Sequence, residues 1–192
     1  MRVGLGTGTT VAELVPLLGR RRLAITCAAT SPETEEMARA QGLDVRPFTG
    51  IDRLDLAIDG ADQVDPVGWL VKGGGGAQTR ERIVAAAADR FVVIVSSDKP
   101  VPRLHAPVPL ELLGFGLAAT LHALPGAVLR DAPRTPDGGV LADYHGEVGD
   151  PALLAERLDA VPGLVSHGLF PPSMVSTVLI ARGAEVEARQ ID

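Results

Sequence analysis

Short apolar runs alternate with segments of helical periodicity along the first half of the sequence. An apolar run at residues 3–5 precedes a predicted helix from about Thr10, and a second run at residues 23–28 precedes a predicted helix over residues 32–41. Ser-Pro-Glu at residues 31–33 supplies a cap, a first-turn proline and an early acid, which together mark a helix start. This alternation is typical of βαβ units and predicts an α/β fold built on a parallel sheet.

Two further apolar runs are each followed directly by a charged residue. Residues 54–58 predict a buried strand that ends at Asp59, and residues 69–71 predict another that ends at Lys72. Catalytic groups in open α/β sheets lie at the carboxyl ends of strands. We therefore expect both residues to lie at the carboxyl edge of the parallel sheet.

The predicted helices and strands become shorter near residue 106. Before it, a predicted helix over residues 77–89 leads into the strongest strand of the chain, residues 91–95. After it, the predicted elements are shorter: strands at 107–111, 127–130, 139–144 and near 164, with helices up to 124 and over 151–159. A last strand at residues 176–181 could return to the first sheet.

The expected architecture therefore has two domains. Residues 1–106 and 174–192 are predicted to form a Rossmann-like catalytic domain, and residues 107–173 a smaller α+β lid domain.

Composition excludes several classes of function. The net charge of −6 argues against generic nucleic-acid binding, and the only basic run, at residues 20–22, is expected to end a helix. Cys27 is the only cysteine, so no intrachain disulfide can form, and it is expected to pack in a strand. The uncharged stretch at residues 112–129 is broken by Pro-Gly and predicts no membrane span. We expect no signal peptide and a cytoplasmic location.

The densest group of chemically active residues lies between Asp59 and Glu81. This segment holds Asp-Gly-Ala-Asp at residues 59–62, Lys72 followed by four glycines, and Arg-Glu at residues 80–81. Only two of the 18 basic residues are lysines, Lys72 and Lys99, and they flank this stretch. A lysine and three carboxylates at the mouth of an α/β crevice could remove a proton next to a carbonyl and stabilise the enediolate that results.

A glycine-rich segment near the N-terminus is a candidate anion site. Gly-Leu-Gly-Thr-Gly-Thr-Thr at residues 4–10 lies between a predicted strand and a predicted helix, where backbone N–H groups could hold a phosphate or a carboxylate. A tight structural turn is an equal alternative. The second predicted strand ends without the acid of a dinucleotide site, and no Walker lysine is present.

Three converging carboxylates also raise the possibility of a metal site. Magnesium or calcium would suit oxygen ligands, but Lys72 can supply the positive charge and no histidine lies in the segment. We expect a site without metal or cofactor. The four histidines lie outside it, and we expect them to be packing or surface residues: His105, His122, His145 and His167.

These motifs resemble those of ribose-5-phosphate isomerase, type A, almost from end to end. The resemblance rests on residues 4–10, 59–62, 72–77, 80–81, 97–99, 109–111, 162–164 and 168–170. Members of that family interconvert ribose 5-phosphate and ribulose 5-phosphate without metal or cofactor, usually as dimers or tetramers. The resemblance thus implies a sugar-phosphate substrate and a homodimer or homotetramer.

The resemblance also implies roles for single residues. Glu81 would be the base that moves a proton between carbons 1 and 2, while Asp59, Asp62 and Lys72 would assist ring opening and stabilise the enediolate. The implied substrate-binding residues are Thr7, Gly8, Thr9, Thr10, Gly60, Ala61, Gly73, Gly74, Gly75 and Lys99.

The sequence departs from the family pattern at several positions. Family members carry a helix before the glycine loop, whereas this sequence begins almost at the loop. Thr9 replaces a usual serine, Gln63 replaces an acid, and residues 96–98 and 135–139 differ from the typical segments. Two alternatives therefore remain open: an isomerase of a different sugar phosphate, and a non-catalytic sugar-phosphate sensor.

Overall fold

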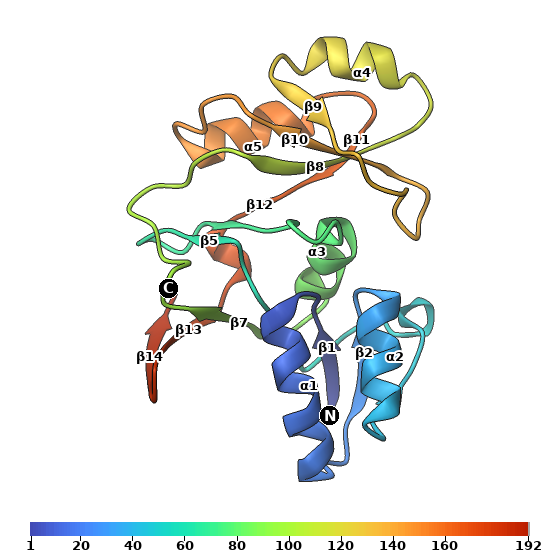
Figure 1. Cartoon of the computed structure of the whole chain (residues 1–192), viewed down its shortest axis with the longest axis vertical. Helices are drawn as coiled ribbons and strands as arrows, with labels where there is room; N and C mark the ends of the chain where they lie inside the picture. Colours follow the sequence, from blue (N-terminus) through green and yellow to red (C-terminus); the bar gives the residue numbers. More distant parts are fainter. Residues whose placement is uncertain (192) are drawn as a thin grey trace. The chain divides into compact units, whose positions relative to one another are not determined.

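The computed structural model describes residues 1–191, which form two compact units. The first unit comprises Met1–Ala61, Arg80–Lys99 and Pro172–Asp192, and the second comprises Asp62–Thr79 and Pro100–Pro171. The predicted domain bounds differ from these units chiefly in the segment Asp62–Thr79, which makes its contacts within the second unit. Figure 1 shows the order of the elements along the chain.

A seven-stranded, mostly parallel sheet organises the first unit, with the strand order β14-β13-β7-β4-β1-β2-β3. Its strands are β1 (Arg2–Leu5), β2 (Thr26–Ala29), β3 (Asp44–Val45), β4 (Leu56–Asp59), β7 (Phe91–Ser96), β13 (Thr177–Arg182) and β14 (Glu185–Gln190). The predicted return of the last strand is confirmed, since β13 pairs in parallel with β7. β14 was not predicted and pairs antiparallel with β13 at the edge.

Helices α1 (Thr9–Arg21), α2 (Pro32–Ala40) and α3 (Gln78–Ala86) follow β1, β2 and β6 along the chain. α1 and α2 lie side by side in Figure 1. The predicted cap of α2 is confirmed, because the hydroxyl of Ser31 accepts a hydrogen bond from the N–H of Thr34 and Pro32 occupies the first turn. The basic run ends α1 as predicted, with Arg22 in the left-handed conformation.

One apolar core of the first unit lies between its sheet and α1 and α2. It contains Val3, Leu5, Val11, Val15, Cys27, Ala38, Leu43 and Val45. Val11 and Val15 are one helical turn apart and present one apolar face of α1 to the sheet. The prediction that Cys27 packs in a strand is confirmed, because it is fully buried in β2.

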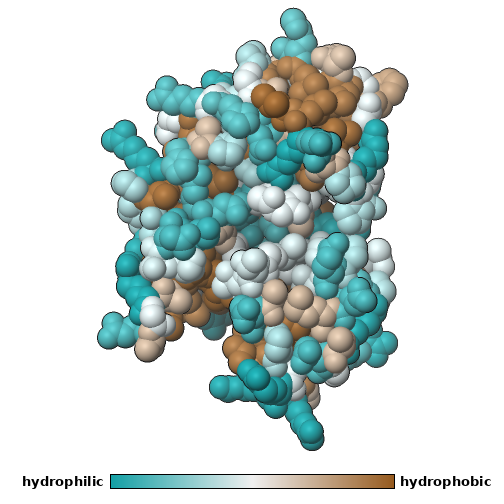
Figure 2. Space-filling view, viewed as in Figure 1, coloured by the Kyte–Doolittle hydropathy of each residue, from teal (hydrophilic) through white to brown (hydrophobic). Residues whose placement is uncertain are grey.

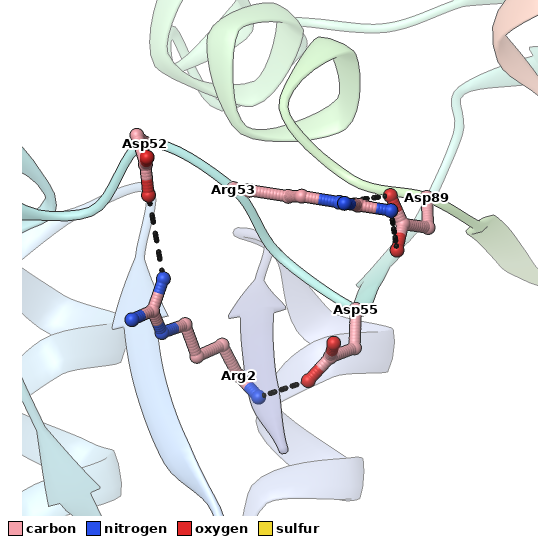
Figure 3. A network of polar contacts seen from close by, with 5 residues as sticks. All are labelled: Arg2, Asp52, Arg53, Asp55 and Asp89. Atoms are coloured by element: carbon pink, nitrogen blue, oxygen red, sulfur yellow. Dashed lines mark hydrogen bonds and ion pairs between the residues drawn. The ribbon is translucent and has the colours of Figure 1, made fainter.

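Charged residues line the opposite, amino-terminal end of β1, where Figure 3 shows a polar network. The backbone N–H of Arg2 donates to Asp55 at 2.6 Å, and its guanidinium donates to Asp52 at 3.3 Å. Arg53 forms a bidentate ion pair with Asp89, with hydrogen bonds of 2.7 and 2.9 Å, and this pair raises the pKa of the Arg53 guanidinium. Because these pairs are exposed, they contribute little to stability.

The second unit contains a four-stranded antiparallel sheet of order β11-β8-β10-β9. Its strands are β8 (Val108–Leu112), β9 (Ala127–Leu129), β10 (Val140–Tyr144) and β11 (Leu164–His167). Helices α4 (Leu117–Ala123) and α5 (Pro151–Asp159) lie on one face of it (Figure 1), and both pack on the same apolar core. The predicted smaller α+β arrangement is thereby confirmed.

A separate three-stranded sheet corrects one prediction. β6 (Leu70–Val71) exists as expected, but it pairs antiparallel with β5 (Gln63–Val64) and β12 (Leu169–Phe170) and is not part of the parallel sheet. The link from β4 is too short for the helical crossover that a parallel pairing needs. Instead, the carboxylate of Asp65 accepts hydrogen bonds from the N–H groups of Val67, Gly68 and Trp69 and closes a hairpin.

The surface of the second unit exposes several large apolar side chains. They are Val67, Leu113, Phe115, Val128, Leu129, Leu153 and Val165, and Phe115 is 94% exposed. Figure 2 shows an apolar area over α4 and the loop that precedes it. None of the helices within residues 1–191 combines the length and the apolar composition that a membrane span requires.

The environment of Cys27 gives a testable consequence. Burial, with a smaller contribution from the carboxylate of Asp44, raises the pKa of this thiol from 9.0 to about 11. At pH 8.5 the native protein should hold about a hundredfold less thiolate than the unfolded chain, so iodoacetamide should label the native thiol at least that much more slowly than in urea. The free energy of unfolding should also fall between pH 9 and 11, because the unfolded thiol ionises first. Equal labelling rates in native and urea-treated protein would contradict this assignment.

Candidate active site

The carboxylate of Asp59 is fixed at the carboxyl end of β4 in the first unit. Its Oδ1 accepts hydrogen bonds from the N–H groups of Thr7 at 3.2 Å and Gly60 at 2.7 Å. Only 3% of Asp59 is exposed. A Cβ added to Gly6 would lie 1.8 Å from the carboxyl carbon of Asp59, so the chain needs glycine there to let the carboxylate approach the backbone.

The glycine-rich loop at residues 6–10 lies beside this carboxylate, at the carboxyl end of β1. The N–H of Gly6 donates to the carbonyl of Ile58 at 2.9 Å, and the hydroxyl of Thr7 contacts that of Thr30 at 2.8 Å. Gly8 adopts a φ of 115° and precedes the first turn of α1, which Thr9 and Thr10 begin. The loop is therefore a tight turn in which the positive φ at position 8 favours glycine. It also leads into the N-terminus of α1, where backbone N–H groups could hold an anion.

Two more predicted residues belong to the first unit. Glu81 lies in the first turn of α3 and is 5% exposed. Lys99 follows β7 and pairs with Asp98 at 3.2 Å. The hydroxyl of Ser96 and then the ammonium of Lys99 lower the pKa of the Asp98 carboxyl.

Lys72 is buried in the second unit, directly after β6. Its backbone N–H donates to the carbonyl of Gly168 at 2.8 Å, and only 2% of the residue is exposed. Its ammonium lies 5.6 Å from the centre of the Phe170 ring, within the range of a cation–π contact. The second unit therefore contacts both the backbone and the ammonium of Lys72. A buried ammonium interacts more strongly with a nearby negative charge than an ammonium in water does.

The glycines that follow Lys72 form a tight turn. The N–H of Gly76 donates to the carbonyl of Gly73 at 3.0 Å, and both residues have positive φ values, of 76° and 100°. The N–H of Gly74 donates to the carboxylate of Asp62 at 2.8 Å. The structure thus brings Asp62 and the glycine run together within the second unit.

A buried acid in β8 was not singled out as a functional residue. Glu111 is 3% exposed, and its carboxylate accepts hydrogen bonds from the hydroxyls of Thr79 and Thr135, the latter at 2.7 Å. Thr79 belongs to the first turn of α3, so this bond ties the start of that helix to β8. Two signals in the sequence pointed to it, a single acid within an otherwise apolar strand and its place in the segment 109–111, which resembles the family pattern.

The departure at Gln63 has a structural reason. Its side-chain amide donates to the carbonyl of His105 at 2.9 Å and accepts from the N–H of the same residue at 2.9 Å. A carboxylate could not donate the first of these bonds. The glutamine therefore bonds to the backbone of the segment before β8.

The histidines are surface or packing residues, as expected. His105, His122 and His145 are exposed, and His167 is buried with its ring 3.2 Å from Asp159. Within residues 1–191, no cluster of three or more histidine, cysteine, aspartate or glutamate side chains has the spacing of a metal site.

Comparison with known proteins decides the family. The family model for ribose 5-phosphate isomerase A (phosphoriboisomerase A) matches residues 26–185. A ribose-5-phosphate isomerase A of Rhodopseudomonas palustris (strain HaA2) is 43% identical over 201 residues, covering 94% of this chain and 86% of its own. The corresponding protein of Roseobacter denitrificans is 42% identical and covers 100% of this chain and 81% of its own. The chain belongs to the ribose-5-phosphate isomerase A family.

Solved structures agree with this membership. Ribose 5-phosphate isomerase A from Methanocaldococcus jannaschii superposes with a TM-score of 0.92 at 30% identity, covering 99% of this chain and 91% of its own. A D-ribose-5-phosphate isomerase solved in complex with phospho-erythronic acid gives a TM-score of 0.92 at 29% identity, covering 99% and 90%. The Rossmann-like fold with a smaller α+β unit is the fold of this family.

Membership in the ribose-5-phosphate isomerase A family settles the class of function. The chain is an enzyme, an isomerase of the pentose phosphate pathway that acts on ribose 5-phosphate. The alternative of a non-catalytic sugar-phosphate sensor is therefore wrong. The full set of acids and the lysine, which a sensor would not need, already favoured the enzyme.

One buried side chain beside the glycine turn gives a stability prediction. Gln78 is fully buried, and neither its amide oxygen nor its amide nitrogen has a hydrogen-bond partner within residues 1–191. Replacing it by methionine, which has a similar shape, should raise the free energy of unfolding by about 1–3 kcal/mol, because a buried polar group without a partner is costly.

Gln63 provides the matched control. Both atoms of its buried amide are bonded to His105, so Gln63→Met should lower the free energy of unfolding by about 1–3 kcal/mol. Urea unfolding followed by circular dichroism measures both. A Gln78→Met variant as unstable as Gln63→Met would show that the Gln78 amide is well solvated or bonded in the folded protein.

Proposed function

We propose that Glu81 is the base that moves a proton between carbons 1 and 2 of ring-opened ribose 5-phosphate. The observation that carries this proposal is a buried carboxylate in the first turn of α3, in a chain that belongs to the isomerase family. A carboxylate takes the proton from carbon 2, and the electron pair forms the enediolate. A proton passes from the oxygen on carbon 2 to the oxygen on carbon 1, and the same carboxyl group returns its proton to carbon 1. General base catalysis of this kind contributes about 10²- to 10⁴-fold.

Lys72 is proposed to stabilise the negative charge that develops on the enediolate. Its low exposure supports this role, because an ammonium held in a low-dielectric environment stabilises a nearby oxyanion more strongly than a solvated one. Asp59 and Asp62 are proposed to assist ring opening by exchanging protons with the sugar hydroxyls. Backbone N–H groups orient both carboxylates, which reduces the rearrangement needed during the reaction.

The sugar phosphate is proposed to bind to backbone N–H groups, hydroxyls and one lysine. The residues proposed are Thr7, Gly8, Thr9, Thr10, Gly60, Ala61, Gly73, Gly74, Gly75 and Lys99. A chain with a net charge of −6 must hold an anion with such local donors, because its overall field repels it. The phospho-erythronic acid bound by the similar isomerase supports the proposal, because its carboxylate resembles an enediolate in shape and charge.

The altered segment at residues 135–139 does not call for a sugar phosphate other than ribose 5-phosphate. Within the second unit, the hydroxyl of Thr135 donates to Glu111 at 2.7 Å and accepts from the N–H of Gly139 at 2.9 Å. A Cβ added to Gly139 would lie 2.0 Å from the carboxylate of Glu111. The departure from the usual family segment therefore serves the packing of a hairpin, which gives no reason to change the substrate.

The two-domain division, the cytoplasmic location and the assembly as a homodimer or homotetramer stay predictions. So does the proposal that the reaction needs neither metal nor cofactor, which rests on the charge that Lys72 supplies.

Replacing Glu81 by Gln tests the proposed base. The variant should lose at least about 10²-fold in kcat, because an amide cannot accept the proton, while its affinity for ribose 5-phosphate should change little. The wild-type rate should also fall on acidification, when the carboxylate becomes protonated. A coupled assay with ribose 5-phosphate in the presence of a chelator measures the rate and tests the metal-free reaction together.

Glu36→Gln is the matched control, because Glu36 is an exposed residue of α2. Its rate should equal that of the wild type. Substantial turnover by Glu81→Gln, with native circular dichroism, would rule out Glu81 as the base, and loss of wild-type turnover in the chelator would rule out a metal-free reaction.

A further inference from the structure

Arg130, just after β9, holds the glycine turn of the second unit from one side. Its Nη1 donates to the carbonyl of Gly73 at 2.9 Å and to the carbonyl of Gly74 at 3.2 Å. Sequence reasoning did not single out this arginine, because its partners are backbone atoms 56 and 57 residues away. The turn is therefore fixed by a side chain of a different hairpin.

Asp143 fixes the guanidinium of Arg130 in turn. The two residues form a fork, with Nε 2.8 Å from one carboxylate oxygen and Nη2 2.7 Å from the other. Their side chains are 17% and 20% exposed, and Asp143 lies on β10, between β8 and β9. A planar fork of this kind fixes direction as well as distance.

Because the peptide bond is planar, the contacts that hold these carbonyls also fix the directions of the N–H groups that follow them. In a trans peptide the C=O and the N–H point in opposite directions. Because Arg130 holds the carbonyl of Gly73, the N–H of Gly74 points the other way, where it donates to Asp62 at 2.8 Å. By the same geometry, the bond to the carbonyl of Gly74 turns the N–H of Gly75 away from Arg130. Gly74 and Gly75 are both exposed.

We propose that Arg130 is a positioning residue that, held by Asp143, aims the N–H groups of Gly74 and Gly75. The first fixes the carboxylate of Asp62, and the second faces the sugar phosphate. This inference rests on the proposed function of the glycine turn in binding substrate. Arg130 does not act by attracting the phosphate, because the carboxylate of Asp143 offsets its charge. Its contribution is the shape of the guanidinium.

The variant Arg130→Lys distinguishes the effect of the shape of the guanidinium from that of its charge. Arg130→Lys keeps the positive charge but cannot bond Asp143 at two points and also reach two carbonyls. Asp143→Asn keeps the size but places an N–H₂ group against an N–H of the guanidinium. Each variant should lower kcat/KM for ribose 5-phosphate about ten- to hundredfold, the range expected when a binding group moves by about 1 Å. Most of the loss should appear in KM. The double variant should be no worse than the poorer single variant, because both residues support one contact.

Arg134→Lys is the matched control. Arg134 belongs to the same hairpin, and its Nη1 donates to the carbonyl of Gly138 at 2.8 Å, outside the glycine turn. Its kcat/KM should stay within about twofold of the wild type. Calorimetric binding of ribose 5-phosphate to Glu81→Gln, with and without Arg130→Lys, should show a loss of affinity equal to the rise in KM.

Several outcomes would overturn the inference. Unchanged kcat/KM in Arg130→Lys would show that the turn does not need the fork. A lower kcat with unchanged KM and a lower melting temperature would assign Arg130 a purely structural role, and additive losses in the double variant would separate Arg130 from Asp143. Failure of the proposed base is distinguishable, because it appears as turnover in Glu81→Gln, whereas kcat/KM of the Arg130 variants is compared in the wild-type background.

Discussion

The parallel pairing of β1 with β4 is the constraint on which the first unit depends. The two strands are separated in the chain by two helices and two strands, yet Leu5 lies opposite Ile58 and the N–H of Gly6 continues the ladder to Ile58. The strand order reverses at this point, because β2 and β3 lie beyond β1 whereas β7, β13 and β14 lie beyond β4, so the carboxyl ends of β1 and β4 are neighbours at the switch point of the sheet. Asp59 and the loop of Thr7 meet there. This contact requires glycine at position 6, because any side chain there would occupy the place of the Asp59 carboxylate.

The second unit also holds a carboxylate in a fixed position, but it does so without a parallel sheet. Its acid and its glycine turn lie in irregular backbone, so no long ladder of hydrogen bonds holds them. The hairpin that carries them is closed by Asp65, and the turn itself is held between Asp62 and the fork of Arg130 with Asp143. In both units a carboxylate is oriented by backbone N–H groups, which are donors that cannot change rotamer. Such preorganisation suits a reaction whose charge appears only transiently on the substrate.

Periodicity in the sequence predicted the regular elements well. The apolar runs that became β1, β4 and β7 and the capped start of α2 are local signals, and local signals need no knowledge of distant contacts. The position of β6 could not be derived in this way, because a short apolar run fits a parallel and an antiparallel strand equally. β14 was missed because it is an exposed edge strand of alternating charge, without the apolar pattern of a buried strand.

The candidate site was predictable in its composition and less so in its supports. The acids, the lysine and the glycines stand close together in the sequence, and family resemblance supplied their roles. Arg130 and Glu111 act through contacts between residues far apart in the chain, with partners that are backbone atoms or threonine hydroxyls. Nothing in the local sequence distinguishes Arg130 from other arginines, and Glu111 stood out only as a lone acid in an apolar strand within a segment of the family pattern. Their roles can be inferred only from the strand pairing and the interatomic distances in the folded structure.

Isomerisation of ribose 5-phosphate in deuterium oxide tests the central claim, proton transfer through an enediolate, most directly. Over prolonged incubation with the wild-type enzyme, proton magnetic resonance should show deuterium entering carbon 1 of ribulose 5-phosphate and carbon 2 of ribose 5-phosphate. The carboxyl proton of a base exchanges with solvent between its removal and its return. Interconversion of the two sugar phosphates over many turnovers, with neither carbon acquiring deuterium, would instead indicate direct hydride transfer and contradict the account.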